Sequence, residues 1–132
     1  MTYVEGFLVA VPSENRDLYQ KHAAGAAHLF HEFGATRMVE AWGDDVKRGK
    51  VTDFYRAVKA EEGEKVVFSF IEWPDKEIRD QAWKAIMADE SLKPEGEMPF
   101  SGQRMFWGGF ETIHDTAKQS APQQQAPVGQ PA

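Results

Sequence analysis

Apolar residues recur with two different periods along the first third of the chain. A short apolar run predicts a strand over Tyr3–Val11, which Pro12 ends. After Ser13, an N-cap residue type, apolar positions return every three to four residues as far as Phe33. This spacing predicts a long amphipathic helix that stops at Gly34.

The rest of the chain predicts three more strands and a second long helix. The most apolar of these segments ends at Pro74, where Asp75 can cap the second helix. In chain order, the expected segments are a strand over Ala35–Gly43, a polar turn over Asp44–Lys50, an extended arm over Val51–Ala60, a strand over Lys65–Trp73, a helix that includes Ile78, Ala82, Ala85 and Ile86, and a strand over Arg104–Ile113.

This order of elements is typical of the ferredoxin-like split βαβ fold. It predicts an α+β domain with a four-stranded antiparallel sheet in the order 4-1-3-2, a hairpin arm, and two helices on one face. The third strand is apolar on both sides, and helices can cover only one of them. Since an exposed surface containing Phe68 and Phe70 favours association, we expect a homodimer that packs sheet against sheet.

Composition limits the chain to one domain and excludes several classes of function. The 132 residues suffice for one core, expected over residues 1–116, and the Gln/Pro/Ala-rich residues 117–132 predict a disordered tail. The absence of cysteine excludes disulfides and thiolate chemistry. A net charge of −6 argues against nucleic acid as a partner. No apolar run or signal-like segment indicates a membrane, so we expect a cytoplasmic protein. We also expect neither a cofactor nor a metal ion.

Five short motifs occur in order along the chain. They are Tyr3-Val4-Glu5-Gly6-Phe7, Gly49-Lys50-Val51-Thr52, Ala57-Val58-Lys59, Met98-Pro99-Phe100 and Gly108-Gly109-Phe110-Glu111. Together they resemble the YbaA-like family, a bacterial group of unknown function in the dimeric α/β-barrel superfamily. The resemblance covers about residues 1–115 and implies a ferredoxin-like protomer whose sheet closes against that of a partner. It implies no reaction and no catalytic residue.

Each predicted strand carries one glutamate among aromatic or aliphatic neighbours. If these share the dimer face of the sheet, a row of carboxylates lines the barrel, where burial raises their pKa values and suits them to acid–base work or cation binding. Alternatively, they lie at strand ends in water or pair with arginines. The candidates are Glu5, Glu40 and Glu111, with Glu72 beside a strand end, and the expected apolar walls and hydroxyl are Trp42, Phe68, Phe70, Trp107 and Tyr3.

His22 is a further candidate, because it falls on the apolar face of the first helix. It would act as a base or proton donor in a pocket between helix and sheet, or it is a hydrogen-bonded core residue. The Met98-Pro99-Phe100 loop would form a lid over the barrel mouth or anchor Phe100 in the core. Gly108 and Gly109 inside a strand indicate a bulge or a close backbone approach.

Two classes of function remain open from the sequence. The first is a protein that binds an apolar or aromatic small molecule inside the dimer barrel, which includes a cofactor-independent enzyme. The second is a non-catalytic interaction or stress-associated dimer whose barrel is filled by side chains. A cavity of several hundred cubic ångströms that contains a glutamate would favour the first class.

Overall fold

Four strands and two long helices make up most of the described chain. The computed structural model describes residues 2–93 and 96–118. The α+β class is confirmed, and each predicted strand and long helix is found with its ends shifted by at most three residues. The main elements are β1 (Tyr3–Pro12), α1 (Arg16–Glu32), β2 (Arg37–Trp42), α2 (Phe54–Ala57), β3 (Glu64–Trp73), α3 (Lys76–Ala88) and β4 (Phe106–Glu111).

Two local predictions are wrong because side chains bond differently from the expected pattern. Ser13 does not cap α1: its hydroxyl donates to the Gly63 carbonyl oxygen at 2.9 Å, and a 3-10 turn precedes the helix. The arm expected to be extended contains α2 instead. Asp53 caps this helix, accepting the N–H groups of Arg56 at 2.8 Å and of Gly49 at 3.0 Å. Asp75 caps α3 as expected, accepting from the Ile78 N–H at 2.8 Å.

The sheet is antiparallel throughout and has the predicted strand order, here β2-β3-β1-β4. The central pair runs in register from Tyr3 opposite Trp73 to Pro12 opposite Glu64. Directly opposed residues point to the same side of a sheet, so the register assigns every side chain to one face.

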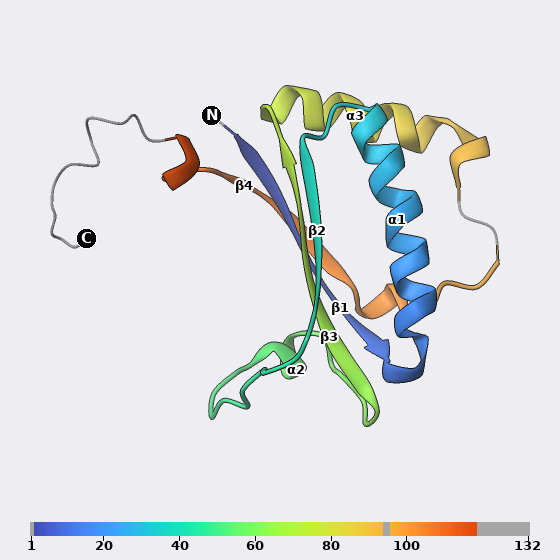
Figure 1. The fold of residues 1–132 in the computed structure, drawn as a ribbon, viewed down its shortest axis with the longest axis vertical. Helices are drawn as coiled ribbons and strands as arrows, with labels where there is room; N and C mark the ends of the chain where they lie inside the picture. The colour runs from blue at the N-terminus through green and yellow to red at the C-terminus, as the bar shows by residue number, and fades with distance from the viewer. Residues whose placement is uncertain (1, 94–95, 119–132) are drawn as a thin grey trace, which may run out of the picture.

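The two faces of the sheet have different environments (Figure 1). Helices α1 and α3 cover one face, called the helix face, to which Glu5 of β1 and Ile71 and Trp73 of β3 point. Phe30 of α1 packs edge-on against Trp73 and against Trp83 of α3, with ring centres 6.2 and 5.1 Å apart. This aromatic cluster joins both helices to the sheet.

The opposite side, called the open face, is only partly covered. The arm that contains α2 packs over one end, where Val58 contacts Ala10 and Val66. Phe54 of α2 meets Phe68 edge-on at 6.3 Å. Phe68, Phe106 and Phe110 are nevertheless 49%, 44% and 62% exposed, which leaves an aromatic surface facing away from the helices.

The domain end expected at residue 116 stays a prediction. A 3-10 turn, Thr116–Lys118, ends the described part of the chain. The remainder of the predicted tail, residues 119–132, lies outside the described residues. Among the helices that the structure describes, none is both long and apolar enough to cross a bilayer.

Candidate functional site

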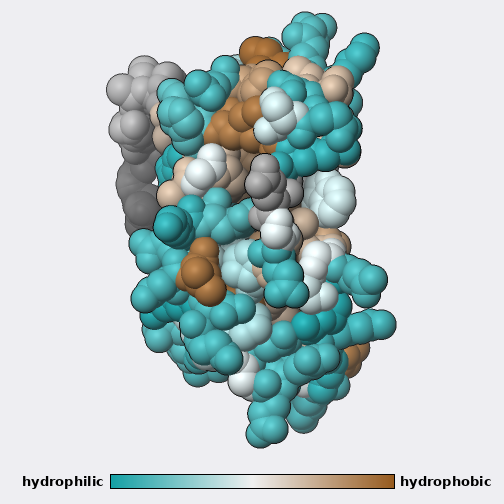
Figure 2. All heavy atoms as spheres, turned by 90° about the vertical axis from the view of Figure 1, so that its right-hand side faces the viewer, coloured by the Kyte–Doolittle hydropathy of each residue, from teal (hydrophilic) through white to brown (hydrophobic). Residues whose placement is uncertain are grey.

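A cavity of about 630 Å³ lies between the helix face of the sheet and the two long helices. Figure 2 views the molecule from this side and shows apolar side chains gathered within an otherwise hydrophilic surface. Apolar groups come from the sheet, from both helices and from the loop that follows α3. They include Phe7, Met38, Ile71, Leu29, Ile86, Met98, Phe100 and Met105. The cavity is thus enclosed by elements distant in sequence.

Among the described residues, Glu40 of β2 is the carboxylate that lines this cavity. The Tyr19 hydroxyl of α1 donates to its Oε1 at 2.6 Å, and Ser69 lies directly opposite in β3. Burial raises the pKa of Glu40, and hydrogen bonds from Tyr19 and Ser69 lower it in part. Burial and the neighbouring Glu40 raise the pKa of Tyr19, so the phenol keeps the proton that it donates. A glutamate with a raised pKa was expected from the sequence, and Glu40 has this property.

His22 lines the same cavity, one helical turn after Tyr19. Burial lowers the pKa of its imidazole, which is therefore neutral at pH 7. Phe100 packs edge-on against both rings, 5.6 Å from His22 and 5.7 Å from Tyr19. The loop that carries Phe100 is tied to the start of α1, since the Asn15 amide donates to the Pro99 carbonyl oxygen at 3.1 Å. Of the two roles considered for this loop, these contacts favour the anchor.

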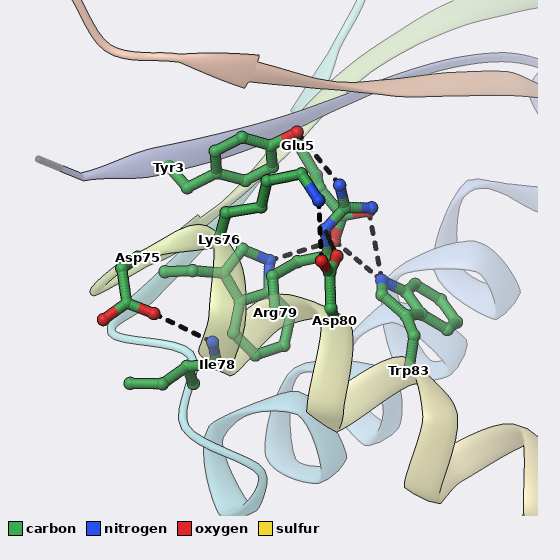
Figure 3. Close-up of polar contacts among 9 residues, drawn as sticks. Tyr3, Glu5, Asp75, Lys76, Ile78, Arg79, Asp80 and Trp83 are labelled. Atoms are coloured by element: carbon green, nitrogen blue, oxygen red, sulfur yellow. Dashed lines mark hydrogen bonds and ion pairs between the residues drawn. The ribbon is translucent and has the colours of Figure 1, made fainter.

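Glu5 of β1 is fully buried, and its carboxylate joins α3 to the sheet (Figure 3). The indole N–H groups of Trp73 and Trp83 donate to Oε1 at 2.9 and 2.8 Å, and Arg79 Nη1 lies 3.3 Å from Oε2. Arg79 also donates to the Tyr3 hydroxyl at 2.9 Å, with its guanidinium carbon 4.8 Å from the centre of that ring. The buried negative charge therefore has a cation and two further donors.

A glycine in the edge strand makes room for this cluster. Gly109 of β4 lies opposite Glu5, and a Cβ at that position would collide with the Tyr3 hydroxyl and the Arg79 guanidinium. The close approach expected at Gly108-Gly109 is confirmed at Gly109. Any larger residue there would displace the groups that hold Glu5.

The expectation that Glu5, Glu40 and Glu111 face a partner's sheet is wrong. Glu5 and Glu40 lie on the helix face, opposite Ile71 and Ser69 respectively. Glu111 pairs with Tyr3 and so points to the same side, but it is exposed at the end of β4. Glu72 is on the open face. The reason is the register: β3 is apolar on both sides, so its sequence does not reveal which side the helices cover.

The predicted apolar walls divide between the two faces in the same way. Phe68 and Phe70 point to the open face, whereas Tyr3, Trp42 and Trp107 point to the helix side of the sheet. Trp107 stacks on Phe7 with ring centres 6.5 Å apart, near the uncovered edge strand. These five residues therefore form no single binding wall. None of them lines the 630 Å³ cavity, but Trp42 lines a second, smaller cavity that also contains Glu40.

Five residues that bond the two glutamates were not predicted from the sequence as site residues. Tyr19 and Ser69 bond Glu40, and Trp73, Arg79 and Trp83 bond Glu5. Tyr19 lies three residues before His22, and Arg79 lies four residues before Trp83, so helical spacing could have indicated both pairs. Ser69 has no such signal. Within residues 2–93 and 96–118, no three His, Asp or Glu side chains are placed to hold a metal ion.

Replacing Glu5 by Gln should destabilise the protein strongly. The amide has one acceptor oxygen where the carboxylate has two, and the substitution leaves Arg79 without its buried counter-charge. We expect the free energy of unfolding in urea to fall by about 3 kcal/mol or more. Glu111→Gln, on the same side of the sheet but exposed, should change it by less than about 0.5 kcal/mol. Equal stabilities of the two variants would contradict the role of Glu5 as the link to α3.

Replacing Glu40 by Gln should leave the stability at pH 7 unchanged or raise it by up to about 1 kcal/mol, because Gln still accepts from Tyr19 and carries no charge. The raised pKa means that the folded wild type holds a proton that the unfolded chain has released. As the pH rises from about 4.3 to the raised pKa of Glu40, the free energy of unfolding of wild type should therefore fall relative to that of Glu40→Gln. Urea unfolding of both proteins between pH 4 and 8 measures this difference. A variant less stable than wild type at pH 7, by a margin independent of pH, would exclude a desolvated carboxylate.

Comparison with known proteins places the chain in a family. Residues 2–102 match the family model described as "Protein of unknown function (DUF1428)". The chain is 60% identical over 116 residues to "Uncharacterized protein YbaA" of Escherichia coli (strain K12), an alignment that covers 87% of this chain and 99% of the relative. YbaA of Escherichia coli O157:H7 and of Shigella flexneri show the same identity and coverage. The chain therefore belongs to the DUF1428 family, which confirms the resemblance to YbaA-like proteins seen in its motifs.

Proposed function

We propose that this protein binds an apolar or aromatic small molecule in the cavity between α1, α3 and the helix face. The main support for the proposal is the cavity itself. Its volume of about 630 Å³ lies within the range of volumes of small-molecule binding sites, and its walls are mostly apolar. Glu40, Tyr19 and His22 supply a few polar groups on one side. Few and localised polar groups in an apolar pocket are typical of sites that orient a ligand.

The same groups can support proton transfer without a cofactor. A neutral imidazole accepts a proton, and a carboxyl whose pKa burial raises holds its proton to a higher pH than an ordinary glutamate does. His22 and Glu40 have these two properties and line one cavity. Acid–base catalysis is therefore the reaction type that best fits this site, if the bound molecule is also transformed.

We further propose that a second copy of the chain covers the open face, so that two ferredoxin-like protomers form a dimeric α/β barrel. The exposed aromatic rings of Phe68, Phe106 and Phe110 support this, as does a groove of about 620 Å³ that they line. The resemblance to the dimeric α/β-barrel superfamily implies the same arrangement. Because the sheet separates this face from the cavity, dimerisation and ligand binding do not compete.

Filling the mouth of the cavity should weaken binding without unfolding the protein. Gly25 lies exposed in the middle of α1 and lines the cavity, and a Cβ there would meet no atom within 4 Å. Gly25→Ala should raise the free energy of unfolding by up to about 1 kcal/mol. Gly25→Trp should weaken the binding of Nile red, a neutral apolar probe, about tenfold relative to Gly25→Ala, because it occupies apolar surface that the probe would bury.

Fluorescence titration of the two variants measures this effect. Binding that is equal in Gly25→Ala and Gly25→Trp, but lost on substitution of Phe110, would place the apolar site on the open face and contradict the proposal. Phe110 is a suitable comparison because its ring lies on the opposite side of the sheet, close to Gly6 and Gly108.

A charge on the open face should separate the dimer. Size-exclusion chromatography with light scattering should give about twice the chain mass of 14.9 kDa for wild type and a single chain for Phe110→Asp. Leu18 of α1 is exposed to a similar extent, 60% against 62% for Phe110, but does not belong to the open face. Leu18→Asp should remain dimeric. A monomeric wild type at micromolar concentration, or a dimer disrupted only by Leu18→Asp, would contradict this arrangement.

A further inference from the structure

We propose that the ligand of the helix-side cavity carries a protonated amine on an apolar body, and that the Glu40 carboxylate binds this amine. The inference rests on the proposed function, because it names the chemical class of the molecule bound in the same cavity. It derives from a difference between two glutamates that share the helix face of one sheet.

Glu5 is fully buried and Glu40 is half-buried, but only Glu5 has a counter-charge. The Glu5 carboxylate has the Arg79 guanidinium at 3.3 Å and two indole donors. Glu40 has the Tyr19 hydroxyl at 2.6 Å and a hydrogen bond from Ser69. In the described part of the chain, no lysine, arginine or histidine forms an ion pair with it. Among the described residues, the fold thus provides a counter-charge for the buried Glu5 and none for the half-buried Glu40.

The basic side chains near Glu40 are engaged elsewhere or remain in water. Arg16 lines a second, smaller cavity that also contains Glu40, but its guanidinium carbon lies 5.5 Å from the centre of the Trp42 ring, over which it stacks. Lys93, at the wall of the main cavity, pairs with Glu90 at 2.9 Å. Lys21 is exposed. His22 is neutral at pH 7 because burial lowers its pKa, so it supplies no positive charge.

A cationic group entering the cavity would supply the missing counter-charge. Burial disfavours the ionised form of Glu40, as the direction of its pKa shift indicates. An ammonium group beside the carboxylate reverses this effect, and a charge-assisted hydrogen bond is stronger than one between neutral groups. A carboxylate on the ligand would instead meet a like charge at close range. The electrostatics therefore select for a positive head group.

The remainder of the cavity suits an apolar body of variable shape. Four thioether side chains from three different segments line it, and these flexible groups adapt to irregular ligand shapes. They are Met38 of β2, Met87 of α3, and Met98 and Met105 of the loop before β4. The edge-on rings of Tyr19 and Phe100 lie close to the carboxylate. An aryl or alkyl amine matches this combination of walls and charge.

Three probes of one size test the inference: 4-phenylbutylamine, 4-phenylbutan-1-ol and 4-phenylbutanoate. They share one apolar body and differ in the charge of the head group at pH 7.5. Isothermal titration calorimetry should show the amine bound by wild type about tenfold or more tightly than the alcohol, and the carboxylate most weakly. In Glu40→Gln the advantage of the amine should disappear, while affinity for the alcohol changes less than about threefold. Glu111→Gln, which removes a glutamate outside the cavity, should behave as wild type.

The outcomes separate this inference from the proposed function. If amine and alcohol bind equally to wild type, and Gly25→Trp weakens both, the cavity binds ligands but the amine preference is wrong. The same conclusion follows if the protein binds Nile red in the cavity but not the amine. Tightest binding of 4-phenylbutanoate would overturn the sign of the charge preference. If Gly25→Trp affects no probe, both the inference and the proposed function are wrong.

Discussion

The burial of the Glu5 carboxylate is the constraint on which this structure depends. A charge placed in the centre of a sheet, with none of its surface exposed, must be compensated by the elements packed over it. Arg79 and Trp83 supply that compensation from α3, and Trp73 supplies it from β3. Because these bonds have defined directions, they fix the position of α3 on the sheet more narrowly than apolar packing alone would do. The requirement extends to β4, where Gly109 leaves room for Arg79.

With α3 fixed in this way, the space between the helices and the sheet becomes a cavity with a stable outline. Its walls are mostly apolar. Glu40 in its wall is held by hydroxyl groups, and no described residue supplies it with a counter-charge. The buried Glu5 therefore stabilises the fold, and the half-buried Glu40 is available to a ligand. The open face is a separate surface on the far side of the sheet, with exposed aromatic rings and no carboxylate besides Glu72 among the residues of its groove.

The sequence predicted the elements and the strand order well, because these depend on local periodicity and on capping residues such as Asp75. It did not predict which face of β3 the helices cover, since Phe68 and Phe70 on one side are as apolar as Ile71 and Trp73 on the other. Because of this ambiguity, the prediction placed Glu5 and Glu40 on the face that would meet a partner's sheet, whereas they lie on the helix face. The partners of both glutamates come from distant segments, and only the tertiary structure brings them together.

The most direct test of this account is a ¹³C NMR titration of the Glu40 carboxyl carbon, assigned by comparison with Glu40→Gln. In the free protein, we expect a midpoint above the value of about 4.3 that is usual for glutamate, because burial disfavours the charged form. In the presence of saturating 4-phenylbutylamine, the midpoint should fall, because the ammonium group favours the charged form. A midpoint at or below the usual value in the free protein, or one that the amine leaves unchanged, would contradict the claim that Glu40 is a partly desolvated carboxylate that binds a cationic ligand.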